Sequence, residues 1–240
     1  MQLVTPAILP KSFAELSEKI NTIKPFVRKV QLDVCDGNYV GNTTWPYTGA
    51  GPSVEEMKRR GEVLPEADTI HYGIDLMVAN PDEVVGDFID LGATRIIIHF
   101  KSTKDFKKTI QLITEKYGYD KEFAPDLLSV GMAVPIDLEL TEYAPYIQYV
   151  DFIQFMGIVD IGKQGQKFDP RVVDRIKNFH KRYPDVCIHV DGGVSLDNAP
   201  ALLAAGADRL AVGSALFKTA NIGHTIKEFE KLSEQYGIYE

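Results

Sequence analysis

The sequence predicts an α/β protein that folds as a single (β/α)8 TIM barrel, and three observations lead to this class. Eight short β-prone runs alternate strictly with helical stretches. The units are near-equal, about 30 residues each, which favours closure over the alternative of a doubly wound open sheet. The 240 residues suit one barrel, and no linker or low-complexity segment divides them, so residues 1–240 are predicted to form one domain.

The predicted strands are runs rich in β-branched and aromatic residues, bounded by Gly, Pro, Asn or Asp. In the second strand, Val30, Leu32 and Val34 alternate with polar residues, so the two sets face opposite sides of the sheet. The eight predicted strands span residues 4–9, 27–34, 71–78, 94–100, 127–134, 149–156, 186–190 and 209–212.

The predicted helices begin at capping residues. Ser12 is a helix N-cap, and Glu15 completes a capping-box pattern three residues later. Pro25 ends this first helix, and Pro170 occupies the first turn of a later one. The predicted helices span residues 13–24, a stretch starting at 53, and residues 82–91, 103–117, 138–144, 171–182, 195–205 and 214–232.

Composition and charge exclude several classes of protein. The formal charge of −8 argues against nucleic-acid binding, which needs clustered Lys and Arg. No apolar run approaches the roughly 18 residues that span a bilayer, and the amino terminus lacks the basic region of a signal peptide. Cys35 and Cys187 lie in apolar runs, which favours two reduced thiols over a disulfide. We therefore predict a soluble, cytoplasmic protein that binds neither nucleic acid nor membranes.

The active end of such a barrel, here called the mouth, is built from the carboxyl ends of the strands and the loops that follow them. Several chemically informative residues are predicted to lie there. They are Asp33, Asp75, His99, Met156, Asp191 and Gly213.

Glycines follow three consecutive strands and predict a phosphate site. Bare backbone N–H groups can approach a phosphate closely, and barrels often bind phosphate with their last loops. Turn formation alone is the alternative explanation. Lys163 could add charge or lie in solvent. The predicted phosphate-binding residues are Gly165, Gly192, Gly193, Gly213 and Ser214.

The aspartates at the mouth allow three interpretations. Asp33 and Asp191 come from strands on nearly opposite sides of the barrel, so they could act as base and acid on two faces of a substrate. With Asp75 they could instead form a metal site of oxygen ligands. Helix or turn capping is the third interpretation, and it is the one we favour for Asp36. A structural role is favoured for His99.

The sequence resembles the ribulose-phosphate 3-epimerase family from about Pro6 to Phe217. The matching segments include L-D-V-C-D-G-N-Y-V-G-N, D-L-M-V-A-N-P, G-K-Q-G-Q-K-F, H-V-D-G-G-V and A-A-G-A-D-R-L-A-V-G-S-A-L-F. The resemblance implies a ribulose-phosphate-binding (β/α)8 barrel in which two aspartates, carried over as Asp33 and Asp191, invert C3 of a ketose phosphate beside a divalent metal. It also implies a substrate pocket, and we expect this pocket to include Ala7, Met77, His99 and Met156.

This sequence departs from the family at the metal site. The family usually has His-x-Asp on the second strand and His on the third, where this chain has Gln31, Asp33 and Asp75. With Asp191, the resemblance then leaves four side-chain oxygen ligands, which suit Mg²⁺ or Mn²⁺ better than Zn²⁺. The family's first-loop Ser is replaced by Ala7.

These observations predict an epimerase acting on a phosphorylated ketose such as ribulose 5-phosphate. Another phosphosugar isomerase or lyase of the same barrel type, or a non-catalytic phosphometabolite-binding protein, is the alternative. A Schiff-base aldolase is disfavoured because no predicted strand ends in a lysine. In the 37–51 loop, Tyr39 and Trp45 could wall the pocket or anchor the loop. The apolar residues of this loop, Tyr39, Val40, Trp45 and Tyr47, could instead pack against a partner, and we expect a homo-oligomer.

Overall fold

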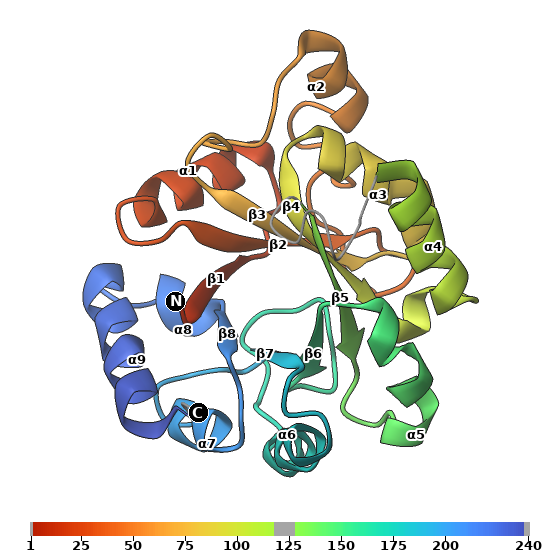
Figure 1. Ribbon diagram of the computed structural model, residues 1–240. Helices are drawn as coiled ribbons and strands as arrows, with labels where there is room; N and C mark the ends of the chain where they lie inside the picture. Colours follow the sequence, from red (N-terminus) through yellow and green to blue (C-terminus); the bar gives the residue numbers. More distant parts are fainter. Residues whose placement is uncertain (1, 118–127, 238–240) are drawn as a thin grey trace.

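The computed structural model describes residues 2–117 and 128–237, and these form a closed barrel of eight parallel strands. The strands follow one another around the barrel in chain order, and the first pairs with the last. Figure 1 shows the helices arranged around the outside of the strands. The predicted fold class is therefore confirmed.

The strands are close to their predicted positions, although the predicted fifth strand starts at residue 127, outside the described residues. They are β1 (Val4–Ile8), β2 (Lys29–Cys35), β3 (His71–Met77), β4 (Ala93–His99), β5 (Ser129–Val134), β6 (Phe152–Met156), β7 (Cys187–Asp191) and β8 (Arg209–Val212).

Most strands are followed by a helix. The α-helices are α1 (Phe13–Ile23), α2 (Val54–Arg60), α3 (Pro81–Asp90), α4 (Phe106–Tyr117), α5 (Leu140–Tyr143), α6 (Arg171–Arg182), α7 (Ala199–Ala204), α8 (Ser214–Phe217) and α9 (Ile222–Tyr236). Short 3₁₀ helices cover Phe100–Ser102 and Ala144–Tyr149. None of the helices in the described ranges is long and apolar enough to cross a bilayer.

The predicted helix ends are only partly correct. Ser12 caps α1, but the Glu15 carboxylate accepts from the N–H of Lys11, so the predicted capping box is incomplete. The predicted helix 214–232 is two helices, because Asn221 leaves the helical conformation and caps α9 through the N–H of His224. Residues 149–151, predicted as strand, instead end the 3₁₀ turn and lead into β6.

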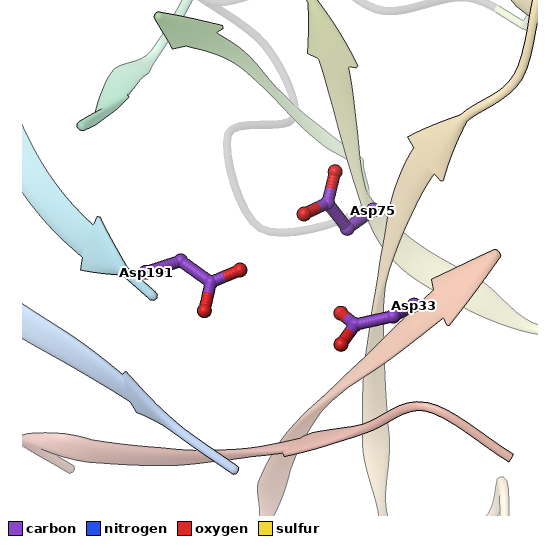
Figure 2. Close-up of side chains that lie close together, drawn as sticks. All are labelled: Asp33, Asp75 and Asp191. Atoms are coloured by element: carbon purple, nitrogen blue, oxygen red, sulfur yellow. The ribbon is translucent and has the colours of Figure 1, made fainter. Parts of the chain in front are cut away.

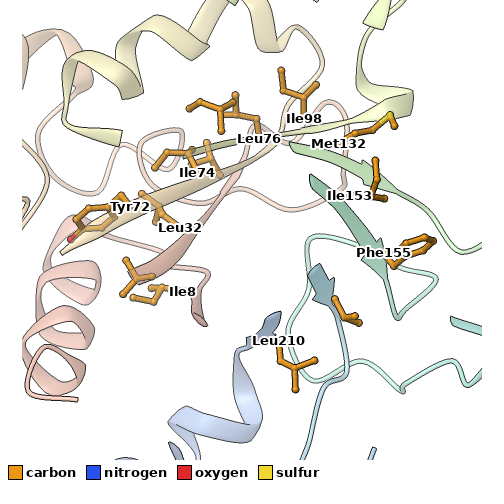
Figure 3. Packing of buried hydrophobic residues seen from close by; sticks show 14 of the residues in the cluster. Ile8, Leu32, Tyr72, Ile74, Leu76, Ile98, Met132, Ile153, Phe155 and Leu210 are labelled. Atoms are coloured by element: carbon orange, nitrogen blue, oxygen red, sulfur yellow. The ribbon is translucent and has the colours of Figure 1, made fainter. Parts of the chain in front are cut away.

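Alternation along the strands separates two environments. One set of side chains, which includes Ile8, Leu32 and Ile74, is fully buried between the barrel and its helices (Figure 3). The opposite set faces the barrel interior. There the chain buries an unusual number of polar residues, among them Gln31, Asp33, Asp75, His99 and Gln154. Buried polar groups need partners, so the interior is where chemistry is expected.

The 37–51 loop is held by its own chain. Trp45 is fully buried, its indole N–H donates to the carbonyl of Pro52, and its ring packs 5.1 Å from that of Phe13. Trp45 is therefore a loop anchor rather than a pocket wall or partner contact. Tyr47 is exposed, which is compatible with a contact to a second copy of the chain. The expected homo-oligomer stays a prediction. The structure leaves Cys35 and Cys187 as free thiols, as predicted.

Candidate active site

Three aspartates converge at the mouth. Asp33, Asp75 and Asp191 come from β2, β3 and β7, and one carboxylate oxygen of each lies within 4.8 Å of the others. Figure 2 shows their side chains pointing toward one another from the surrounding strands. Asp33 and Asp75 are register partners in neighbouring strands, which places them side by side. Asp191 reaches them from across the barrel.

Gln31 links the two aspartates predicted to be catalytic. Its Nε2 donates to Asp33 Oδ1 and to Asp191 Oδ2, both at 2.9 Å, and lies 3.5 Å from Asp75 Oδ2. Carboxylates only accept hydrogen bonds, so the amide nitrogen is the end that faces them. We expected Gln31 to present its carbonyl oxygen as a metal ligand. The structure instead shows it as a donor that holds the two carboxylates together.

Asp75 is held by two hydrogen-bond partners of its own, His99 and Gln154. His99 Nε2 lies 2.9 Å from Asp75 Oδ1, and Gln154 Nε2 donates to Asp75 Oδ2 at 3.1 Å. The ring of Tyr39 lies 5.6 Å from that of His99. All three hydrogen-bonded side chains are fully buried. His99 is thus placed as a partner of Asp75, outside the residues that line the mouth cavity.

Burial and mutual repulsion raise the pKa of both predicted catalytic carboxyls. Burial, together with the charges of Asp191 and Asp75, raises the pKa of Asp33 well above its usual range. Burial and the charge of Asp75 raise the pKa of Asp191 to about 7. The hydrogen bonds from Gln31 oppose both shifts. A carboxyl that titrates near neutral pH can either take or give a proton.

A cavity of about 50 Å³ lies above the aspartates. It brings together nearly all of the predicted site residues. Its lining includes Ala7, Asp33, Met77, Met156, Gly165, Asp191, Gly192, Gly193, Gly213 and Ser214. Lys163 also lines it.

Four of the glycines in this lining, Gly162, Gly165, Gly192 and Gly193, have a left-handed backbone. Gly192 and Gly193 have φ of +100° and +67°, which side chains disfavour. A Cβ on Gly193 would also lie 2.8 Å from the backbone of Phe168. The loop after β7 therefore needs Gly192 and Gly193 in order to fold, and the same lack of side chains lets a ligand come close to its backbone.

Two glutamines of the site were not predicted. Gln154 supports Asp75, and its position on the same face as Met156 on the sixth strand was the only available signal. Gln164 reaches across the mouth from the loop after β6, and its Nε2 donates to the carbonyl of Ala7 at 3.0 Å. A Cβ on Gly213 would lie 2.8 Å from this Nε2. Gln164 thus covers Gly213.

The donor set suits a hard divalent cation. The three aspartates offer carboxylate oxygens at a spacing that one ion can bridge, and oxygen ligands favour Mg²⁺ or Mn²⁺ over Zn²⁺. Rotation of the Gln31 amide would add its Oε1 as a fourth ligand. The identity of a metal stays a prediction.

Comparisons with solved structures describe the fold. 3-Hexulose-6-phosphate synthase from Salmonella typhimurium superimposes with a TM-score of 0.65 at 16% identity, over 98% of this chain and 99% of that one. 3-Keto-L-gulonate-6-phosphate decarboxylase from Vibrio cholerae gives 0.69 at 10% identity, over 98% and 99%. Together with the closed strand order, these superpositions define the class of fold as a (β/α)8 barrel.

The chain belongs to the ribulose-phosphate 3-epimerase family, whose model matches residues 3–217. Ribulose-phosphate 3-epimerase from Escherichia coli K12 is 32% identical over 236 residues, covering 94% of this chain and 93% of that protein. The enzyme of the same name from Candida glabrata is 30% identical over 237 residues, covering 95% and 91%. The protein is accordingly a carbohydrate epimerase.

Proposed function

We propose that this protein inverts C3 of ribulose 5-phosphate, or of a close ketose phosphate, by proton transfer involving Asp33 and Asp191. The observation that carries the proposal is the pair itself. The buried carboxyl of Asp33 and the partly exposed carboxyl of Asp191, both with raised pKa values, reach the same cavity from different sides of the barrel. The relatives named ribulose-phosphate 3-epimerase support the choice of substrate.

Each carboxyl has one task in a given direction of reaction. The ionised member removes the C3 proton, which is acidic because it lies next to the C2 ketone. The protonated member returns a proton to the opposite face, and the two exchange roles in the reverse direction. Because the pKa of Asp191 is raised to about 7, both of its forms are populated near neutral pH.

Gln31 and Asp75 position this pair. The Nε2 of Gln31 fixes one oxygen each of Asp33 and Asp191, which orients both carboxyls toward the space between them. Asp75 is held in place by His99 and Gln154 and adds negative charge beside the pair. A divalent cation held by the three aspartates would supply positive charge to the oxyanion that develops at C2. Gln31 would add its Oε1 to such a cation only after rotation of the amide, which would end the Nε2 hydrogen bonds to Asp33 and Asp191.

The phosphate is proposed to lie against the glycine backbone. Gly192, Gly193 and Gly213 have no side chain to keep it away, and backbone N–H groups there can donate to its oxygens. The cavity of about 50 Å³ is small for a phosphopentose. We infer that Gln164 leaves Ala7 and Gly213 when substrate binds, and that its loop then packs over the phosphate.

The test is proton exchange at C3. Ribulose 5-phosphate is incubated with the enzyme in D₂O, with chelator and with added Mg²⁺ or Mn²⁺, and the C3–H signal is followed by ¹H NMR. We expect loss of this signal together with appearance of the epimer. No exchange under any metal condition would overturn the proposal. Loss of a carbon from the substrate, seen by ¹³C NMR, would instead support the lyase alternative.

A further inference from the structure

A second, larger cavity lies at the opposite end of the barrel, where the strands begin. Its volume is about 430 Å³, within the range of small-molecule sites of about 300–1,000 Å³. Its lining comes from the first residues of β2, β3, β4, β5, β6, β7 and β8. The proposed epimerase chemistry makes no use of it.

Cations dominate the lining. Of the residues that the structure describes, the lining holds three cations, Lys29, Arg95 and Arg209, and one carboxylate, that of Asp151. This is notable in a chain with a formal charge of −8. The lower layers of such barrels are normally filled by branched apolar side chains. Placing several cations there is costly unless anions neutralise them.

Arg209 is the clearest sign of a missing partner. Within residues 2–117 and 128–237 its guanidinium has no hydrogen bond or ion pair, and its buried Nε is left without an acceptor. Among the described residues, Arg95 donates from Nε to Ser129 Oγ at 3.3 Å, and its guanidinium carbon lies 5.4 Å from the centre of the Phe152 ring. Neither contact supplies negative charge.

The pKa values of Arg95 and His189 are lowered by burial and by the positive charges beside them. Burial and the charge of Arg209 lower the pKa of Arg95 to about 10. Burial and the charges of both arginines lower the pKa of His189 well below its usual value, and His189 stacks on Phe152 with ring centroids 4.0 Å apart. Besides burial, both shifts follow from the closeness of the two arginines to each other and to His189.

We propose that this cavity binds a small anion through a phosphate group, which Arg95 and Arg209 would hold from two sides. The planar forks of two guanidinium groups match phosphate oxygens. The hydroxyl of Ser129, in the same lining, accepts from Arg95 and can donate its own proton to a further oxygen. The ligand class is inorganic phosphate or a small phosphate monoester.

Cys187 provides a probe that needs no substitution. It lines this cavity and is half-buried, whereas Cys35 is fully buried at the other end of the barrel. The rate of alkylation of each thiol by iodoacetamide is measured by peptide mass spectrometry, with and without inorganic phosphate at constant ionic strength. We expect phosphate to slow alkylation of Cys187 several-fold. A parallel series with ribose 5-phosphate distinguishes the free ion from a phosphate monoester.

The matched variants are Arg209→Gln and Arg59→Gln. Both remove one positive charge, but Arg59 is exposed on α2, away from the cavity. We expect Arg209→Gln to raise the phosphate concentration that gives half-maximal protection of Cys187 at least tenfold. Arg59→Gln should leave this concentration unchanged. Arg209→Lys keeps the positive charge but loses the planar guanidinium group, so it should give intermediate protection. It replaces the Gln variant if that variant fails to fold.

Two results would overturn the proposal: no protection of Cys187 in the wild-type protein, or equal protection in Arg209→Gln. Because the readout is the thiol at the lower end of the barrel, it does not depend on whether the protein epimerises ribulose 5-phosphate. Failure of one proposal would leave the other standing.

Discussion

At the scale of single residues, the site depends on Asp33, Asp191 and the amide between them. The sequence predicted both aspartates, because a carboxylate at the end of a barrel strand needs a reason to be there. It did not predict that Gln31 would donate to both of them, since that depends on which strands face each other across the barrel.

Asp33→Asn and Asp191→Asn should each abolish most of the activity. Each change removes an acid or base while keeping the size of the side chain, so we expect kcat to fall by about 10²–10⁴-fold. The measurement is steady-state epimerisation of ribulose 5-phosphate. Asp90→Asn is the control, since Asp90 is exposed and pairs with Lys58 far from the mouth. Near-normal kcat in either site variant would refute its catalytic assignment.

Gln31→His should change the metal preference. An imidazole is a far better zinc ligand than an amide, so we expect Zn²⁺ to bind at least about tenfold more tightly. Zinc affinity is measured by calorimetry, which needs no turnover. Gln148→His, on the exposed 3₁₀ turn, controls for an added surface imidazole. Equal gains in both variants would show that Gln31 does not face a cation site.

At the scale of elements, the strands were predicted more accurately than the helices. Strand positions follow from alternating burial, which the sequence carries directly. Helix ends depend on competing caps. Glu15, for example, bonds to Lys11 rather than completing its box with Ser12, whereas Ser53 and Glu56 form the complete box at α2. Such choices between nearby donors are made by tertiary packing.

Gly193→Ala should damage the mouth more than an ordinary left-handed glycine does. Gly193 and Gly61 have nearly equal φ, +67° and +65°, but only Gly193 would place a Cβ against Phe168. The left-handed backbone alone costs roughly 1–2 kcal/mol. We expect Gly61→Ala to lose about that much stability with KM unchanged, and Gly193→Ala to lose more and raise KM. Urea unfolding and kinetics test this, and identical effects would contradict it.

At the scale of the whole molecule, the buried carboxyls couple stability to pH. The pKa of Asp191 is raised from 3.8 to about 7 in the folded protein, so the folded state binds more protons than the unfolded state between these values. The free energy of unfolding of the metal-free protein should therefore fall as pH rises from about 4 to 7. This group contributes at most about 1.4 kcal/mol per pH unit.

Urea unfolding across this pH range, in the presence of a chelator, measures the slope. Asp191→Asn should make the slope smaller because the amide does not titrate, and the remaining slope should come from Asp33, whose pKa is also raised. Asp90→Asn should retain the full slope. A slope that is the same in Asp191→Asn would mean that other groups carry the pH dependence.

The sequence by itself determined the (β/α)8 class, the family and the aspartates and glycines of the mouth, because these depend on local periodicity and on motifs within single loops. The tertiary structure alone decided which atoms meet. It brought Gln31 between Asp33 and Asp191, His99 and Gln154 behind Asp75, and Arg95 and Arg209 into one cavity. These contacts join strands far apart in the chain, and only closure of the barrel sets their distances.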